Sequence, residues 1–135
     1  MTRRDTVNGQ CHCGAVRWIA ALPPKLVINC HCNLCRQLSG ADYSSWVIFP
    51  ASQFRLLAGE DMLAHYQATA QFRKSFCSRC GATVSAVNDS KLPGCVYVAR
   101  GNITDSTDFP VNFQVYTNDK APWVCLDGNI PVFNP

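Results

Sequence analysis

The sequence predicts an all-β fold, and three observations lead to this prediction. Short runs rich in β-branched and aromatic residues recur about every eight to twelve positions, with turn residues between them. Little of the chain shows the apolar periodicity of an amphipathic helix. Seven of the nine cysteines fall in tight groups that lie far apart in the chain, so distant segments must meet. With 135 residues the chain has the size of one domain, and we expect a single folded unit over residues 1–135.

The expected elements begin after a polar segment, residues 1–7, that we expect to be frayed. The run from Val16 to Ala20 fits a partly buried strand, and a Pro-Pro pair ends it. Residues 33–40 indicate a polar or helical turn closed by Gly40. The clearest strand signal, Ser44 to Phe49, stops at Pro50. Further strands, separated by glycine and small polar residues, are expected over residues 26–29, 54–57, 62–67, 72–76, 82–87, 95–98 and 114–116.

Composition and charge exclude several classes of protein. Hydrophobic residues make up 47% and charged residues 16%, as in ordinary globular chains. The longest apolar stretches are too short to span a bilayer, so we expect no membrane partner. The formal charge of +3 falls to about zero once seven thiolates and two divalent ions are counted, and the basic residues are scattered, so we expect no nucleic-acid partner. The first ten residues lack the apolar core of a secretory signal, which favours a cytoplasmic location.

The motif CSRCG at residues 77–81 is typical of a metal-binding knuckle, in which Gly81 takes a positive φ as the chain leaves the turn. Its partner is expected to be CHCG at residues 11–14, because residues i and i+2 of a straight strand face the same side. We expect Cys11, Cys13, Cys77 and Cys80 to bind one structural zinc ion, worth on the order of 10 kcal/mol to folding. Two independent redox pairs are the alternative, but the residues after Cys80 do not resemble the helix that follows a thioredoxin-like CxxC.

The motif CHCNLC at residues 30–35 supplies three more cysteines, Cys30, Cys32 and Cys35. Three protein ligands and one exchangeable position are typical of catalytic zinc. An incoming thiol would bind there as a thiolate with a lowered pKa. The sequence therefore predicts a second zinc ion, open to a small thiol.

Several residues near this motif keep more than one interpretation. Cys95 or Cys125 could complete the tetrahedron and make the second site structural, although Cys95 fits a buried apolar position. His31 lies between two expected ligands and is either a structural histidine or a proton shuttle. His12 and His65 are interpreted as structural or surface residues.

Three polar residues follow the third cysteine of the motif directly. Arg36, Gln37 and Ser39 are candidates to contact a bound ligand, because a zinc ion with three or four thiolates is negatively charged overall and needs hydrogen-bond donors around it. A solvated turn explains the same residues equally well.

Taken together, CHCGAVRW, CHCNLCRQLSGA, FCSRCGAT and KAPW, in that order, resemble the glutathione-dependent formaldehyde-activating family, which includes centromere protein V-like domains. The resemblance runs from about Gly9 to Phe133. It implies a zinc-stabilised β-tent fold of short antiparallel strands, with a structural zinc on the first four cysteines and a second zinc on the other three. It also implies glutathione, or a comparable small thiol, as the partner.

The activity that the resemblance implies is carbon–sulfur lyase chemistry on S-(hydroxymethyl)glutathione, the adduct of glutathione and formaldehyde. Two positions depart from the family pattern. Gln114 stands where a histidine is frequent ahead of the Ala-Pro-Trp stretch, and residues 101–105 replace a Gly that is followed by Leu-Asp. The alternative is a zinc-organised binding or interaction module without chemistry, in which the second ion is structural as well.

Overall fold

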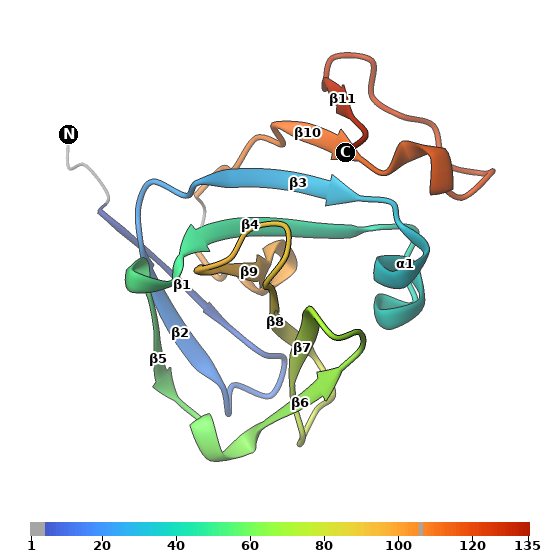
Figure 1. The fold of residues 1–135 in the computed structure, drawn as a ribbon. Coiled ribbons are helices and arrows are strands. Elements are labelled where there is room, and N and C mark those ends of the chain that lie inside the picture. Colours follow the sequence, from blue (N-terminus) through green and yellow to red (C-terminus); the bar gives the residue numbers. More distant parts are fainter. Residues whose placement is uncertain (1–4, 106) are drawn as a thin grey trace.

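The computed structural model describes residues 5–105 and 107–135, which form two β-sheets (Figure 1). The smaller sheet has three strands in the order β1–β2–β5, namely β1 (Thr6–Gln10), β2 (Arg17–Ala21) and β5 (Phe54–Ala58). The larger has eight in the order β11–β10–β3–β4–β9–β8–β7–β6. Its strands are β3 (Leu26–Cys30), β4 (Ser44–Pro50), β6 (Leu63–Gln67), β7 (Phe72–Cys77), β8 (Thr83–Asn88), β9 (Cys95–Ala99), β10 (Phe113–Val115) and β11 (Val132–Phe133). The predicted all-β class is confirmed.

Helices are short and lie between strands. Within the described part of the chain the α-helical segment is α1 (Asn33–Ser39), where the sequence predicted a polar or helical turn. It ends at Gly40, whose φ of 69° is left-handed. Single 3-10 turns connect other strands: η1 (Ala51–Gln53), η2 (Glu60–Met62), η3 (Arg100–Asn102) and η4 (Thr117–Asp119). None of the described helices is long and apolar enough to cross a membrane.

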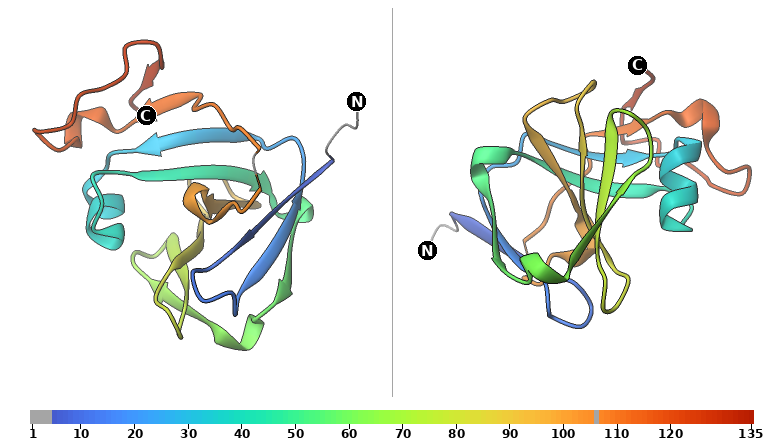
Figure 2. Two further views of the ribbon diagram at one scale, coloured as in Figure 1. Left: turned by 180° about the vertical axis from the view of Figure 1, so that it is seen from behind. Right: turned by 60° about the horizontal axis from the view of Figure 1, so that its bottom comes forward.

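The larger sheet bends, so that its two ends take different directions. In Figure 1, β3 and β4 run across the top, while the β6–β7 hairpin lies below them on one side and the three-stranded sheet on the other. Figure 2 shows the same arrangement from behind and from below. The space that the two sheets enclose is filled by a core that includes Val7, Trp18, Val47, Phe49, Val84 and Val98.

Strand β4 is buried on both faces, because its residues alternate between two apolar clusters. Val47 and Phe49 belong to the core between the sheets. Trp46 and Ile48 face the opposite way, into a second cluster that also contains Cys30 and Cys35. A strand covered on both sides carries apolar residues at successive positions rather than in alternation. This explains why β4 gave the strongest strand signal.

The N-terminal segment differs from its prediction. Residues 1–4 lie outside the described residues, but β1 begins at Thr6 and pairs in antiparallel fashion with β2, so the expectation of fraying over residues 5–7 is wrong. Local sequence could not show this, because Val7 is the only strongly apolar residue of the strand and becomes fully buried only through pairing. Gly9 lies opposite Trp18, whose indole occupies the place where a Cβ would stand.

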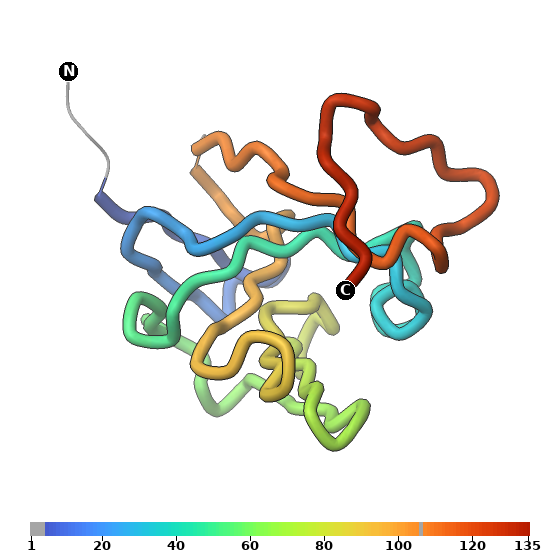
Figure 3. Tube along the Cα trace, turned by 45° about the horizontal axis from the view of Figure 1, so that its top comes forward, coloured from blue at the N-terminus to red at the C-terminus, as the bar shows by residue number. Residues whose placement is uncertain are grey.

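The C-terminal segment forms a wide loop over residues 117–131, seen in Figure 3, and returns as β11 beside β10. The sheet is otherwise antiparallel, but β10 pairs in parallel with both β3 and β11. The short β11 was not predicted, because Val132 and Phe133 are flanked by proline and asparagine.

Candidate metal centres

Four cysteine sulfurs meet where the two sheets approach each other. The Sγ atoms of Cys11, Cys13, Cys77 and Cys80 all lie within 4.8 Å of one another. The first two follow β1 in the smaller sheet, whereas the other two lie at the end of β7 in the larger sheet. An ion bound here would therefore join the two sheets.

Tight turns present these sulfurs. The Cys11 N–H donates to the Val16 carbonyl at 3.0 Å, and the Val16 N–H donates to the Cys11 sulfur at 3.3 Å. Cys11 and Cys13 thus lie in a turn between β1 and β2, and the expected straight strand is wrong. Gly14 has a φ of 78° in this turn. In the second turn Gly81 has a φ of 79°, as predicted, and donates to the Cys77 carbonyl at 2.8 Å.

The sulfur positions fit a tetrahedral metal. Cysteine binds zinc at about 2.3 Å, so two sulfurs of a regular tetrahedron lie about 3.8 Å apart. The Sγ atom of Cys13 is 3.7 Å from that of Cys11 and 3.7 Å from that of Cys77. These cysteines can hold a metal ion with little rearrangement.

The second group, which we call the triad, comprises Cys30, Cys32 and Cys35, whose sulfurs also lie within 4.8 Å of one another. Cys30 ends β3, Cys32 is the N-cap of α1, and Cys35 lies in the first helical turn. The Cys35 N–H donates to the Cys32 sulfur at 3.3 Å, and the sulfurs of Cys30 and Cys32 are 3.5 Å apart. The triad too can hold a metal ion.

Among the residues that the structure describes, neither remaining cysteine joins the triad group. Cys95 begins β9 and is buried in the apolar cluster next to Trp46 and Ile48. Cys125 lies exposed in the C-terminal loop and lines a different cleft. A metal ion held by the triad would have three cysteine ligands from this group.

The thiols of the triad interact strongly, because their sulfurs lie close together and hydrogen-bond to one another. Hydrogen bonds from Cys30 and Cys35 lower the pKa of Cys32 to about 3. Hydrogen bonds with Cys32 and Cys35, together with burial, raise the pKa of Cys30 above its usual range. A divalent cation would let all three sulfurs ionise, which is the ordinary coupling of metal binding to proton release. In the first group, a hydrogen bond from the Ala82 backbone lowers the pKa of Cys80 to about 6.

The triad opens onto a cleft of about 450 Å³, which we call the apolar cleft. All three triad cysteines line it, and most of its remaining wall is aliphatic or aromatic. Its other lining residues are Leu26, Ile28, Leu34, Trp46, Phe72, Asn88, Lys91, Leu92, Tyr97, Val115, Tyr116, Phe133 and Pro135.

Two polar groups of the wall lie among this apolar surface. The indole Nε1 of Trp46 is buried beside the Cys35 thiol, and its N–H favours the thiolate form of that cysteine. Burial, reinforced by nearby Cys30, raises the pKa of Tyr97 to about 12, so its hydroxyl keeps its proton at neutral pH. Both side chains line the apolar cleft beside the triad.

The predicted ligand-contacting residues lie elsewhere around α1. Arg36 donates to the Asp119 carbonyl at 3.0 Å and stacks on Trp123 at 5.8 Å. With Gln37 it lines a separate recess near Trp123. The Ser39 hydroxyl donates to the Cys35 carbonyl at 2.8 Å. The structure brings none of these three side chains to the apolar cleft.

His31 projects from the other face of β3, away from the triad. It is fully buried, its Nε2 is 2.7 Å from Gln114 Oε1, and its ring packs on Tyr43 at 4.8 Å. It lies in the wall of a second cleft, of about 540 Å³, which we call the polar cleft. Sequence reasoning did not find this cleft, because its residues come from distant segments, among them Asn29, His31, Tyr43, Arg100, Gln114, Cys125 and Asp127.

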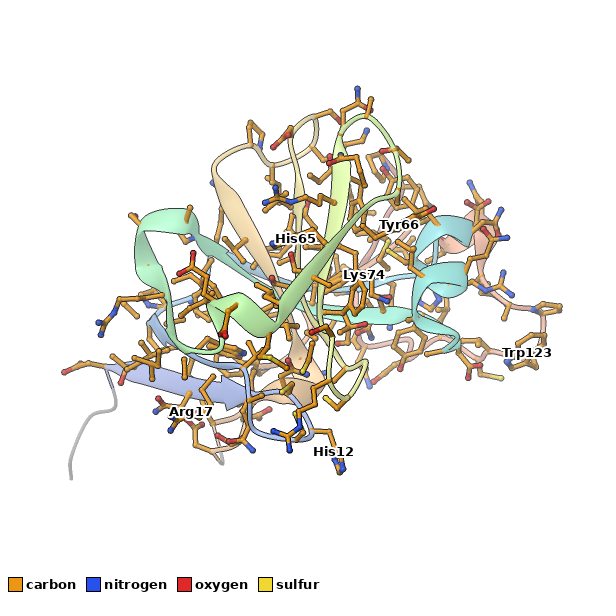
Figure 4. The ribbon with its side chains drawn as sticks, turned by 90° about the horizontal axis from the view of Figure 1, so that it is seen from below. His12, Arg17, His65, Tyr66, Lys74 and Trp123 are labelled. Carbon is orange, nitrogen blue, oxygen red and sulfur yellow. The ribbon has the colours of Figure 1, made fainter. Side chains whose placement is uncertain are left out.

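The other two histidines are surface or structural residues, as predicted. His12 is exposed on the turn between β1 and β2, and Figure 4 shows it pointing outward. His65 Nδ1 is 2.7 Å from the Ser75 hydroxyl across the β6–β7 pair. Figure 4 also shows Trp123 far out on the C-terminal loop.

Fold and site together define a class: a small all-β protein with two cysteine groups that can each hold a metal ion. A family model described as glutathione-dependent formaldehyde-activating enzyme matches residues 6–119, and the chain belongs to this family. A Halomonas elongata protein that carries the same family description is 29% identical over 128 residues, covering 90% of this chain and 81% of the relative. A crystal structure of a Rhodobacter sphaeroides protein is similar in fold, with a TM-score of 0.64, 20% identity, and coverage of 93% of this chain and 99% of that one.

Proposed function

We propose that this chain is a zinc-dependent carbon–sulfur lyase, which adds a thiol of the glutathione type to a small aldehyde and reverses that addition. The observation that carries the proposal is the triad: three sulfurs within 4.8 Å of one another that border a cleft and leave a fourth position for a ligand. Membership of the family supports a reaction related to glutathione and formaldehyde.

The reaction is balanced without a further reactant. The thiol sulfur forms a bond to the carbonyl carbon, the π bond of the carbonyl opens onto its oxygen, and the thiol proton ends on that oxygen. Glutathione and formaldehyde give S-(hydroxymethyl)glutathione, and the lyase direction reverses each change. A zinc ion held by Cys30, Cys32 and Cys35 would supply Lewis acidity that lowers the pKa of a thiol ligand.

The chain itself would position and stabilise the reacting groups. The apolar wall keeps water from the triad and strengthens electrostatic interactions there. Trp46 and Tyr97 line the apolar cleft beside the triad, and they are our candidates to stabilise an oxygen that gains negative charge as the C–S bond forms. Thiol addition to aldehydes is intrinsically easy, so positioning accounts for much of the catalysis that we expect.

The finer assignments belong to the same proposal. We infer two zinc ions per chain, a structural one on Cys11, Cys13, Cys77 and Cys80 and a catalytic one on the triad. We also infer a single zinc-binding domain over residues 1–135, a cytoplasmic location, and a small thiol as the partner. A contact between Arg36, Gln37 or Ser39 and the ligand stays a prediction, and none of the three lines the apolar cleft.

The test is the rate of S-(hydroxymethyl)glutathione formation, measured by exchange NMR against the uncatalysed rate. Zinc-loaded protein should accelerate it, and Cys35→Ser should abolish the acceleration, because the triad then loses a ligand. Cys125→Ser is the matched control, since that thiol is exposed and lies outside both groups. If no acceleration occurs with both ions bound, the enzyme proposal is wrong and the zinc-organised binding module becomes the better account.

A further inference from the structure

Two of the basic side chains beside the triad already have partners. Arg36 follows Cys35 directly in α1, but its guanidinium group donates to the Asp119 carbonyl at 3.0 Å and stacks on a tryptophan of the C-terminal loop. Lys74 lines a small recess together with Cys35, and its Nζ donates to the Leu38 carbonyl at 2.7 Å. Neither basic side chain lines the apolar cleft. Both therefore help to hold α1 in place rather than to bind a ligand there.

Lys91 differs from both of them. It lines the apolar cleft together with the triad, and it is the only basic residue among the described residues that do so. The same described residues include no aspartate or glutamate. The ammonium group of Lys91 has no hydrogen bond or ion pair with any described residue. The cleft therefore presents an unpaired positive charge on the surface that it shares with the cysteines.

A short turn between β8 and β9 fixes the backbone of Lys91. The Asn88 side-chain oxygen accepts hydrogen bonds from the backbone N–H groups of Ser90 and Lys91, at 3.2 and 3.1 Å. The Leu92 N–H donates to the Asn88 carbonyl at 3.3 Å. Asparagine side chains commonly stabilise turns in this way. Asn88 and Leu92 also line the cleft, so the turn holds the exposed lysine at its edge.

We propose that Lys91 binds the glycyl carboxylate of glutathione, while the sulfur of the same molecule binds the metal ion of the triad. The inference rests on the proposed function and deepens it, because it names the residue that selects the thiol. The γ-glutamyl end of glutathione carries a carboxylate and an ammonium group, whose charges cancel. The net charge of glutathione therefore comes from its glycyl carboxylate, and Lys91 makes the site prefer anionic thiols to neutral ones.

Electrostatics explains why the site needs a cation at this position. A divalent ion with three thiolates carries a net negative charge, which repels any further anionic group that approaches it. A lysine on the same cleft offsets this repulsion, and the apolar wall lowers the local dielectric constant and so strengthens the attraction. Because Lys91 itself is exposed, its ion pair is partly screened by water, and we expect a modest gain in affinity.

The dimensions of the cleft are compatible with this assignment. The glycyl carboxylate of glutathione is six bonds from the sulfur, and an extended segment of that length spans about 7 Å. The apolar cleft has a volume of about 450 Å³, within the range of about 300–1,000 Å³ that is typical of small-molecule sites. The cysteine and glycine parts of glutathione therefore fit the cleft that the triad and Lys91 share.

The experiment titrates three thiols into the full chain loaded with Co²⁺, whose thiolate charge-transfer bands report a further sulfur ligand. Glutathione has the glycyl carboxylate, its glycyl monoethyl ester lacks that charge, and N-acetylcysteamine is a small neutral thiol. We expect Lys91→Met to weaken glutathione about three- to fivefold, whereas the ester and N-acetylcysteamine bind as before. Lys91→Arg keeps the positive charge and should keep most of the affinity for glutathione.

A second lysine supplies the matched control. Lys25 is exposed like Lys91 but does not line the apolar cleft, so Lys25→Met should leave the binding of all three thiols unchanged. In the rate assay, Lys91→Met should raise KM for glutathione without lowering kcat, because the carboxylate lies away from the sulfur and carbon that react. A general loss of structure would instead weaken N-acetylcysteamine as well.

The outcomes separate this inference from the function on which it rests. If Lys91→Met leaves glutathione unchanged, or weakens all three thiols equally, the role of Lys91 is wrong while the metal–thiol function stands. Equal binding of glutathione and its monoethyl ester to the unaltered protein would likewise show that the glycyl carboxylate is not recognised. If none of the thiols alters the cobalt spectrum and the reaction is not accelerated, the proposed function fails together with this inference.

Discussion

Two kinds of cysteine differ in what surrounds them. Cys77 is fully buried at the junction of the two sheets, whereas Cys32 is partly exposed at the start of α1. Removing a cysteine from the first group would leave the turns of two sheets without the ion that we propose they share, while removing one from the triad would affect the apolar cleft. Loss of metal should therefore have different consequences at the two positions.

We predict that Cys77→Ser costs several kcal/mol of unfolding free energy or prevents folding, because the binding free energy of a structural ion is folding free energy. Cys32→Ser should lose the triad metal and all activity but keep the fold. Thermal unfolding followed by circular dichroism, together with metal analysis, measures both effects, with Cys125→Ser as the control. Equal stability of the Cys77 and Cys32 variants would contradict the division into a structural and a functional site.

His31 shows how a buried polar residue depends on a partner that sequence spacing does not reveal. Its Nε2 is 2.7 Å from Gln114 Oε1, and both side chains are almost fully inaccessible to water. Gln114 stands at a position where the family pattern often has a histidine, so the chain keeps a hydrogen-bonding group there. This contact makes a structural role the better interpretation of His31.

Gln114→Leu should destabilise the protein by about 1–3 kcal/mol, because the His31 ring loses its partner in a site that water does not reach. Urea denaturation measures the change. Gln71→Leu, at an exposed position, controls for the substitution itself and should change stability by less than about 0.5 kcal/mol. A similar loss in both variants would mean that the His31 hydrogen bond contributes nothing.

Most of the strands could be predicted from local sequence, because their own residues favour a strand. The others depend on pairing with distant segments and could not be predicted in this way. Strand β4 was clear, because β-branched and aromatic residues fill both of its faces. Strand β1 was missed, since Thr6–Gln10 owes its structure to pairing with β2 rather than to its own composition. The parallel pairing of β10 with β3 depends on where a long connection brings the chain back beside β3, and local sequence patterns do not encode that position.

The turn before β6 brings Gly59 against the β1–β2 turn. Gly59 has a φ of 87°, and an added Cβ would collide with the carbonyl of Ala15. This contact joins η2 to the segment that carries Cys11 and Cys13, so the glycine helps to position the first cysteine group.

We predict that Gly59→Ala destabilises the fold by at least about 2 kcal/mol, because a left-handed backbone and a clash with main-chain atoms add together. Gly101→Ala is the matched control: no atom lies within 4 Å of its added Cβ, and its φ is not left-handed. Thermal unfolding distinguishes the two variants. If they unfold at the same temperature, the close approach of Gly59 to Ala15 is unimportant for stability.

For the whole molecule, the spacing of the cysteines predicted more than the spacing of the apolar residues. Short intervals such as CxxC constrain sulfurs locally, and the structure places the seven expected sulfurs in two groups. The clefts could not be predicted, because each is assembled from segments far apart in the chain. The position of the triad could therefore be predicted from the sequence, whereas the apolar character of the cleft beside it could not.

The two metal ions should leave the protein in a fixed order. A group of four thiolates holds zinc more firmly than a group of three, and protons compete with the metal for every thiolate. We predict that purified protein contains up to two zinc ions per chain, and that a mild chelator or gradual acidification removes the triad ion first. β-Sheet circular dichroism should persist through this first release and collapse at the second, because the remaining ion joins the two sheets. Zinc release followed with a colorimetric indicator, in parallel with circular dichroism, measures both steps.

The variant Cys35→Ser is the control, and it should show only the second step. Release of both ions in a single step that coincides with unfolding would argue that the triad ion is structural as well.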